Sequence, residues 1–162
     1  MPELILIIGP SGAGKTTYAR MHYPQHLHPD YEALIRTLFA SQDLFRFYPQ
    51  VRATGARLHR LAVRELLLRQ MNVCIPETAG TALKRKQWID IAQEANVLVH
   101  CILLRVDQAT AIHRACTDSL RPKTARPSWP PMIERWYRDF EPVCCEEEGI
   151  TDYREVDWNH EI

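Results

Sequence analysis

The stretch that decides the fold runs from Glu3 to Thr16 and reads Glu-Leu-Ile-Leu-Ile-Ile-Gly-Pro-Ser-Gly-Ala-Gly-Lys-Thr. Residues 3–8 form a short apolar run that is followed at once by glycine, which predicts a buried strand of the parallel type. Residues 9–16 then fit the pattern G-x-x-x-x-G-K-[ST]. A helix is expected over residues 14–22, so the pattern joins the end of a strand to the start of a helix, as such a phosphate-binding loop requires.

Each position of this loop has a physical reason. The glycines at 9, 12 and 14 permit positive φ and let backbone N–H groups surround a phosphate, beside the positive end of a helix dipole. The Lys15 ammonium can reach the β- and γ-phosphates, and the Thr16 hydroxyl is an oxygen ligand suited to Mg²⁺. The loop therefore predicts binding of a nucleoside triphosphate, taken to be ATP, together with Mg²⁺. The residues expected to contact the nucleotide are Gly9, Ser11, Gly12, Ala13, Gly14, Lys15, Thr16 and Thr17.

Strand and helix patterns alternate along the rest of the chain, which is typical of a parallel sheet with right-handed crossovers. The length of 162 residues suits one domain over 1–162. We predict an α/β fold, a three-layer α/β/α sandwich with a mainly parallel sheet, which is the P-loop nucleoside triphosphate hydrolase/kinase fold, with a helical lid at about 114–131. Further strands are expected at 72–76, 97–106 and 153–156, and helices at 31–40, 54–71, 82–94, 108–118 and 131–140.

Three further features of the sequence add to the predicted fold. Residues 41–53 look irregular and are rich in aromatic side chains. The helix at 54–71 is amphipathic, with an expected apolar stripe of Leu58, Leu61, Ala62 and Leu66. The five cysteines show no C-x-x-C spacing, which indicates reduced and mostly buried thiols.

Charge is distributed unevenly, although Lys plus Arg and Asp plus Glu are 20 each. Residues 46–71 hold six arginines against one acid, whereas residues 139–162 hold nine acids against Arg154. Zero net charge excludes a histone-like protein that coats nucleic acid, but it permits a local basic groove. The acidic end is expected to face solvent or to cap the sheet away from the phosphates. A membrane span and a secretory signal are not expected, so we predict a cytoplasmic protein.

The type of reaction depends on what surrounds the loop. A switch GTPase would carry an N-K-x-D motif and a motor ATPase an Asp-Glu pair after a strand, and neither is present. A small kinase fits better, and it needs a base near the acceptor and an acid near the metal. Asp30 follows the first strand–helix unit, where it can accept a hydroxyl proton or cap the next helix. Glu77 ends the second strand and can hold a magnesium-bound water.

A kinase also needs positive charge over the phosphates. Arg114, Arg121 and Arg126 fall at the end of one helix and in the loop after it. Such a loop can close over the triphosphate, exclude water and offset developing charge. We expect at least one of these arginines to do so.

The residues quoted so far, with Ala53-Thr-Gly-Ala56 and the segment 129–142 after the lid, resemble the 5′-hydroxyl polynucleotide kinase group over roughly residues 4–142. The resemblance is greatest to the kinase domain of bacterial end-healing enzymes and to the phage enzyme. It implies Lys15 and Thr16 on phosphates and metal, Asp30 as general base and Arg121 or Arg126 on the triphosphate. The chain departs from the group on the acceptor side, at Ala33 and at Glu77-Thr78-Ala79-Gly80.

Several acceptors remain open. A basic stripe, Arg57, Arg60 and Arg64, can track a single-stranded nucleic-acid 5′ end, or it can be a solvated helix face. The aromatic side chains of Phe45, Phe47 and Tyr48 can stack on a terminal base or pack in the core or lid. A small-molecule kinase is the alternative enzyme, and a non-catalytic nucleotide-sensing module is the alternative from another class.

Overall fold

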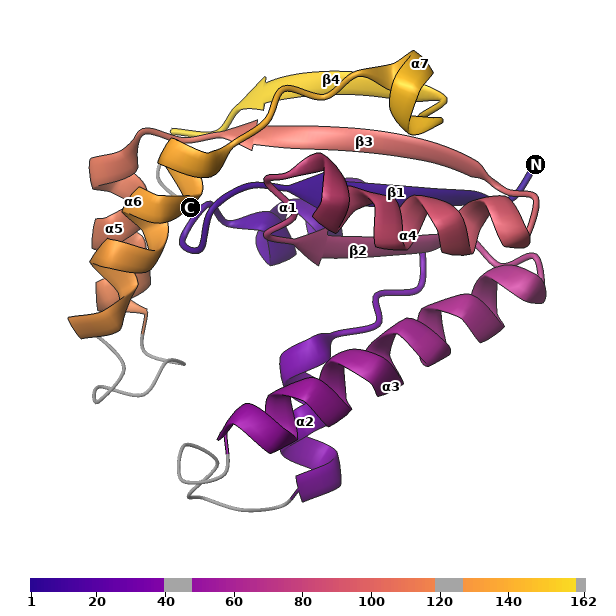
Figure 1. Ribbon diagram of the computed structural model, residues 1–162, viewed down its shortest axis with the longest axis horizontal. Coiled ribbons are helices and arrows are strands. Elements are labelled where there is room, and N and C mark those ends of the chain that lie inside the picture. The colour runs from indigo at the N-terminus through magenta and orange to yellow at the C-terminus, as the bar shows by residue number, and fades with distance from the viewer. Residues whose placement is uncertain (40–47, 119–126, 160–162) are drawn as a thin grey trace.

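A computed structural model describes residues 1–39, 48–118 and 127–159 of the chain. Within these residues, four strands form one parallel sheet in the order β2-β1-β3-β4 (Figure 1). The register aligns Ile8, the last residue of β1, with Glu77 of β2 and with Leu103 of β3. The loop after β1 and the loop after β2 therefore leave the sheet at the same edge. The strands are β1 (Glu3–Ile8), β2 (Val73–Glu77), β3 (Leu98–Arg105) and β4 (Asp152–Asp157).

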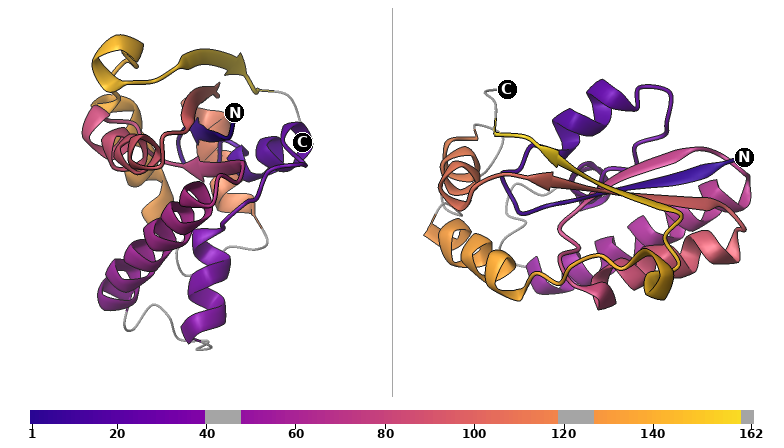
Figure 2. Two further views of the ribbon diagram at one scale, coloured as in Figure 1. Left: turned by 90° about the vertical axis from the view of Figure 1, so that its right-hand side faces the viewer. Right: turned by 90° about the horizontal axis from the view of Figure 1, so that it is seen from above.

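Helices cover both faces of this sheet, which confirms the predicted α/β/α sandwich. Side chains of β1 alternate between the faces: Leu4, Leu6 and Ile8 pack with α3 and α4, whereas Ile5 and Ile7 pack with α1 and α5. In Figure 2 the helices lie on both sides of the sheet. The helices are α1 (Lys15–His22), α2 (Tyr31–Phe39), α3 (Tyr48–Leu68), α4 (Ala82–Glu94), α5 (Gln108–Thr117), α6 (Trp129–Asp139) and α7 (Cys145–Glu148).

Helix α3 differs most from the expectation. It begins at Tyr48, six residues earlier than the predicted start at 54. Gly55 lies inside the helix and faces α2: a Cβ there would stand 2.6 Å from Cγ1 of Ile35. The buried side of α3 is also different, with Val63 and Leu67 fully buried and Leu61 exposed. The expected apolar stripe was therefore wrong, and the buried positions recur every four residues, at Gly55, His59, Val63 and Leu67.

Helices α2 and α3 pack together below the sheet, while α5 and α6 stand together beyond the carboxyl ends of the strands (Figure 1). Helix α6 begins at Trp129, two residues before the predicted start, with two prolines in its first turn, where a missing N–H costs nothing. Among the described helices, none is both long and apolar enough to cross a bilayer.

The five cysteines are free thiols. Cys74 and Cys101 are buried as expected, but Cys144 is exposed and the other two are half-buried, so the expectation of mostly buried thiols was too broad. Burial raises the pKa of the Cys74 and Cys101 thiols to about 12, which leaves both protonated and unreactive at neutral pH.

Candidate active site

The loop between β1 and α1 is shaped to surround an anion. Gly12 and Gly14 have φ of +83° and +82°, a region that side chains with a Cβ rarely adopt. A Cβ on Gly12 would stand 2.0 Å from the Ala111 carbonyl oxygen, so the loop also packs directly against α5. Gly14 caps α1 without a side-chain hydrogen bond. The first amides of α1 are therefore free of a side-chain cap and suited to a phosphate.

Lys15 lies across this loop. Its Nζ donates hydrogen bonds to the carbonyl oxygens of Gly9 at 2.9 Å and Pro10 at 2.7 Å. Thr16 is exposed beside it, and Ser11 and Thr17 are half-exposed. The ammonium group is thus held where a phosphate bound by the loop amides would meet it.

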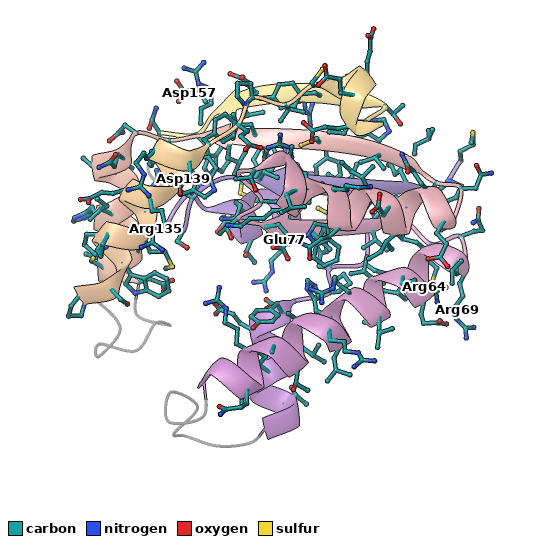
Figure 3. All side chains as sticks on the ribbon, in the orientation of Figure 1. Arg64, Arg69, Glu77, Arg135, Asp139 and Asp157 are labelled. Carbon is teal, nitrogen blue, oxygen red and sulfur yellow. The ribbon has the colours of Figure 1, made fainter. Side chains whose placement is uncertain are left out.

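Most of the predicted site residues line one large cavity of about 1600 Å³, whereas Gly9 and Ala13 do not line it. Its walls include Lys15 and Thr16 from α1, Asp30 from the start of α2, Glu77 from β2 and Arg114 from α5. Residues far apart in the sequence meet here because parallel strands end at one edge of the sheet. In Figure 3, Glu77 lies at the lower side of the sheet, above α3.

Asp30 has the capping role that its position suggested. One carboxylate oxygen, Oδ1, accepts the backbone N–H of Ala33 at 3.0 Å, and the Asp30 carbonyl accepts the N–H of Leu34 at 2.9 Å. These bonds satisfy the first turn of α2 and fix the carboxylate on the cavity wall. A capping role and a place beside the nucleotide are therefore compatible.

Glu77 is unusual in its ionisation. Burial raises the pKa of its carboxyl to about 7, although the Lys15 ammonium, the backbone N–H of Thr78 and the Arg60 guanidinium all oppose this rise. A cation bound nearby would favour the charged form further. Within the described residues, no three His, Cys, Asp or Glu side chains gather to hold a metal by themselves. A magnesium ion held by Thr16, Glu77 and phosphate oxygens fits this set, because Mg²⁺ keeps several waters.

His59 was not singled out from the sequence, yet it lies between the two acids. Its Nε2 is 3.0 Å from the Pro29 carbonyl oxygen, and its Nδ1 is 3.7 Å from Oε1 of Glu77. Burial lowers the pKa of the imidazole. The sequence signal was a polar residue on the i, i+4 stripe that α3 buries, where an unpartnered polar group would be costly.

The arginines fall into three situations. Arg114 lines the cavity and donates from Nη1 to the Trp158 carbonyl oxygen at 3.1 Å. Arg121 and Arg126, like Phe45 and Phe47, lie outside the described residues, and the Tyr48 side chain is likewise undescribed. Within the basic stripe, Arg64 forms a two-pronged ion pair with Glu94 of α4, one arm at 2.8 Å, and Arg60 is 3.4 Å from Oε1 of Gln87. Arg57, Arg60 and Arg64 together line a shallow groove between α3 and α4.

Comparison with known proteins places this site in a family. The family model AAA_33, described as an AAA domain, matches residues 4–117, which contain the loop, Asp30, His59 and Glu77. The chain belongs to the AAA_33 family. This AAA_33 chain is also 30% identical over 111 residues to the bifunctional polynucleotide phosphatase/kinase of Schizosaccharomyces pombe. That match covers 68% of the chain but 23% of the relative, so the chain spans about a quarter of the relative's length.

Solved structures share the fold of this AAA_33 chain at low identity. A structure from the PezAT chromosomal toxin-antitoxin system of Streptococcus pneumoniae has a TM-score of 0.71 at 17% identity and covers 97% of this chain and 67% of its own. A gluconokinase from Sinorhizobium meliloti 1021 has a TM-score of 0.61 at 14% identity, with 99% and 85% covered. The AAA_33 chain therefore has a nucleotide-binding, P-loop kinase-like fold.

Proposed function

We propose that this chain transfers the γ-phosphate of ATP to a hydroxyl group, and that the acceptor is the 5′-hydroxyl end of a polynucleotide. The observation that carries the proposal is the meeting of Lys15, Thr16, Asp30 and Glu77 around one cavity. The 30% identity to a polynucleotide phosphatase/kinase supports the choice of acceptor. A kinase works mainly by positioning and by stabilising charge, and these residue types supply both.

The nucleotide side of the site follows from the loop. Its backbone amides and the Lys15 ammonium bind the β- and γ-phosphates. Thr16 and Glu77 would hold Mg²⁺, Glu77 through a bound water. The ion, when bound, neutralises charge on the phosphate oxygens. Arg114 at the end of α5 borders the same space. We assign further positive charge over the phosphates to Arg121 and Arg126, which lie outside the described residues.

The acceptor side is centred on Asp30. Because Oδ1 accepts the Ala33 amide, we assign Oδ2 to the acceptor hydroxyl. It orients the hydroxyl and takes its proton as the new oxygen–phosphorus bond forms and the bond to the leaving ADP oxygen breaks. Arg57 and Arg60 then bind the phosphate backbone of the polynucleotide. Arg64 contributes less to this binding, because Glu94 partly neutralises its charge.

A small-molecule hydroxyl is the second candidate acceptor. The pairing of Arg64 with Glu94 favours it, since this pairing removes positive charge from the stripe that a polynucleotide would use. A polynucleotide needs positive charge outside the cavity and a small molecule does not, so an assay with both kinds of acceptor separates them.

The test is transfer of label from γ-labelled ATP with Mg²⁺ to 5′-hydroxyl DNA, 5′-hydroxyl RNA and a panel of sugars and nucleosides. We expect label on a polynucleotide end, and loss of transfer in a Lys15→Ala variant. Label on a metabolite alone would overturn the proposed polynucleotide acceptor and support the proposed kinase activity. Label in free phosphate alone, or none, would contradict the transfer and favour a nucleotide-sensing module.

A further inference from the structure

His59 is a buried polar residue with a partner on each side. It projects from the middle of α3 with 3% of its surface exposed, and it contacts the segment before α2 and the end of β2. The ring is held between two aromatic side chains, with centroids 5.2 Å from Trp88 and 5.9 Å from Tyr31. His59 also borders the cavity, but with 3% of its surface exposed it offers almost none of its ring to a substrate, so we look for its role in its contacts with Pro29 and Glu77.

The partner atoms define which ring nitrogen carries hydrogen. A carbonyl oxygen only accepts, so Nε2, at 3.0 Å from the Pro29 oxygen, must be the donor. Nδ1 is the nitrogen near Glu77, at 3.7 Å from Oε1. The Pro29 bond is thus the shorter and better defined of the two contacts.

The Pro29 bond bears directly on Asp30. Pro29 has no N–H, and its ring restricts its own φ. Its carbonyl oxygen is therefore the backbone group of Pro29 to which another element can hydrogen-bond. On the other side of Asp30, the Ala33 amide binds Oδ1. The carboxylate is therefore held from α2 by its own cap and from α3 by His59, through one peptide group.

We propose that His59 is a positioning residue, whose Nε2–H holds the Pro29 carbonyl and so fixes the Asp30 carboxylate against the acceptor hydroxyl. The role rests on the proposed phosphoryl transfer and adds to it a residue that acts through Asp30. It predicts a specific division of effects. Loss of the bond should lower kcat, because the base is misplaced, and should leave the KM for ATP unchanged, because the phosphate-binding loop is untouched.

Three variants separate the two contacts of the ring. The His59→Gln amide can place its nitrogen near the position of Nε2 and donate to the Pro29 oxygen, whereas the shorter His59→Asn amide reaches only the Nδ1 side, near Glu77. His59→Leu removes both contacts. We expect kcat to fall roughly ten- to hundred-fold in His59→Leu and His59→Asn, with the KM for ATP within about two-fold of the wild type, and to recover in His59→Gln.

Several results would overturn the positioning role. Wild-type kcat in His59→Leu would do so, as would recovery in His59→Asn but not in His59→Gln, which would move the role to the Glu77 contact. The folded fraction of each variant is measured by circular dichroism, and kcat is expressed per folded molecule. If the loss of total activity in all three variants equals the loss of folded protein, His59 supports folding and has no positioning role.

A second readout does not depend on catalysis. Amide hydrogen exchange in the first turn of α2, at Ala33 and Leu34, should quicken in His59→Leu and return toward the wild-type rate in His59→Gln. If the wild type transfers no phosphate, the proposed function fails, yet the exchange result still reports whether His59 holds the turn. Unchanged exchange in His59→Leu would overturn the positioning role even in an active kinase.

Discussion

At the scale of single residues, Glu77 has an ionisation that pH can reveal. Burial raises the pKa of its carboxyl from 4.5 to about 7 in the folded protein. As pH rises from 4.5 to 7, the unfolded chain loses this proton first, so the folded state loses stability relative to it. Below pH 4.5 the ionisation of Glu77 costs the folded state no stability, and above pH 7 this loss of stability is complete.

A Glu77→Gln variant tests this ionisation. Because Gln resembles the protonated acid, the variant should unfold at nearly the wild-type urea concentration at pH 4.5. At pH 8 it should be more stable than the wild type by roughly 3 kcal/mol. Urea unfolding at both pH values, without Mg²⁺ or nucleotide, measures the difference. An equal change at both pH values would show that Glu77 does not titrate in this way.

The phosphate-binding loop is tested by a Gly12→Ala variant. An alanine at this position would have to adopt a positive φ, and its Cβ would lie 2.0 Å from the Ala111 carbonyl oxygen, so the loop must move. Strain of roughly 1–3 kcal/mol corresponds to a loss of nucleotide affinity of roughly five- to 150-fold. Calorimetric titration with a non-hydrolysable ATP analogue and Mg²⁺ measures it.

Gly149 offers a matched control for Gly12. It also has a positive φ, of +75°, but it follows α7 and its Cβ would meet the flexible Gln93 side chain. Gly149→Ala should lower stability and leave nucleotide affinity unchanged. Equal affinity losses in the two variants would indicate a general loss of folding rather than a loop that must keep its shape.

At the residue scale, the sequence allowed us to predict which side chains would line a common cavity. Lys15 and Thr16 follow from a contiguous motif, and Asp30 and Glu77 follow from their places after predicted elements at the end of a parallel sheet. These four do line one cavity. His59 could not be found in this way, because its importance depends on which face of α3 is buried, and tertiary packing determines that face.

At the scale of elements, a buried arginine joins α4 to the segment between α6 and α7. Arg85 is fully buried, and its Nε and Nη2 donate to the two oxygens of Glu148 at 2.6 and 2.7 Å. It also donates to three backbone carbonyl oxygens, those of Gly80, Glu141 and Pro142. The loop after Glu77 is thereby held against the carboxyl-terminal third of the chain.

An Arg85→Met variant should be destabilised by roughly 3–5 kcal/mol, because it leaves the Glu148 carboxylate without its cation and removes one donor from each of three carbonyl groups. Lys86→Met is the control: the next residue along the chain pairs with Asp90 on the exposed side of α4 and should change stability by less than about 0.5 kcal/mol. Urea unfolding at pH 7 measures both. Similar stability in the two variants would mean that the buried ion pair contributes nothing.

Element boundaries were predictable where caps mark them. Helix α4 occupies the predicted range, and Thr81 before it accepts the Lys84 amide in the expected capping geometry. Helix α3 starts earlier than predicted, at Tyr48, because the last part of the segment expected to be irregular is helical. Helix α7 was missed because four residues are too short to show a helical period.

At the scale of the whole molecule, zero net charge conceals two surfaces. The basic stripe lies on α3, and Arg64 lies toward the end of that helix that is remote from α5 and α6 (Figure 3). The acidic segment runs through α7 and β4 at the far edge of the sheet from β2. It does not stay wholly clear of the site as expected, since Asn159 lines the cavity and Trp158 accepts from Arg114.

This charge distribution predicts graded effects along the stripe. If a polynucleotide is the acceptor, Arg57→Ala and Arg60→Ala should each weaken its binding and reduce the salt dependence by about one counterion. Arg64→Ala should do less, because Glu94 already partly neutralises Arg64. Binding of labelled 5′-hydroxyl DNA and RNA at several salt concentrations measures this. Unchanged affinity in all three variants would point to a small-molecule acceptor.

The central claim is that Asp30 serves as the base in phosphoryl transfer to a hydroxyl, and an Asp30→Asn variant tests it most directly. Asn caps a helix as well as Asp does, so the Ala33 bond and the melting temperature should be preserved. Transfer from γ-labelled ATP to the acceptor should nevertheless fall at least about a hundred-fold, with nucleotide affinity unchanged. Transfer at the wild-type rate by a normally folded Asp30→Asn protein would contradict the account.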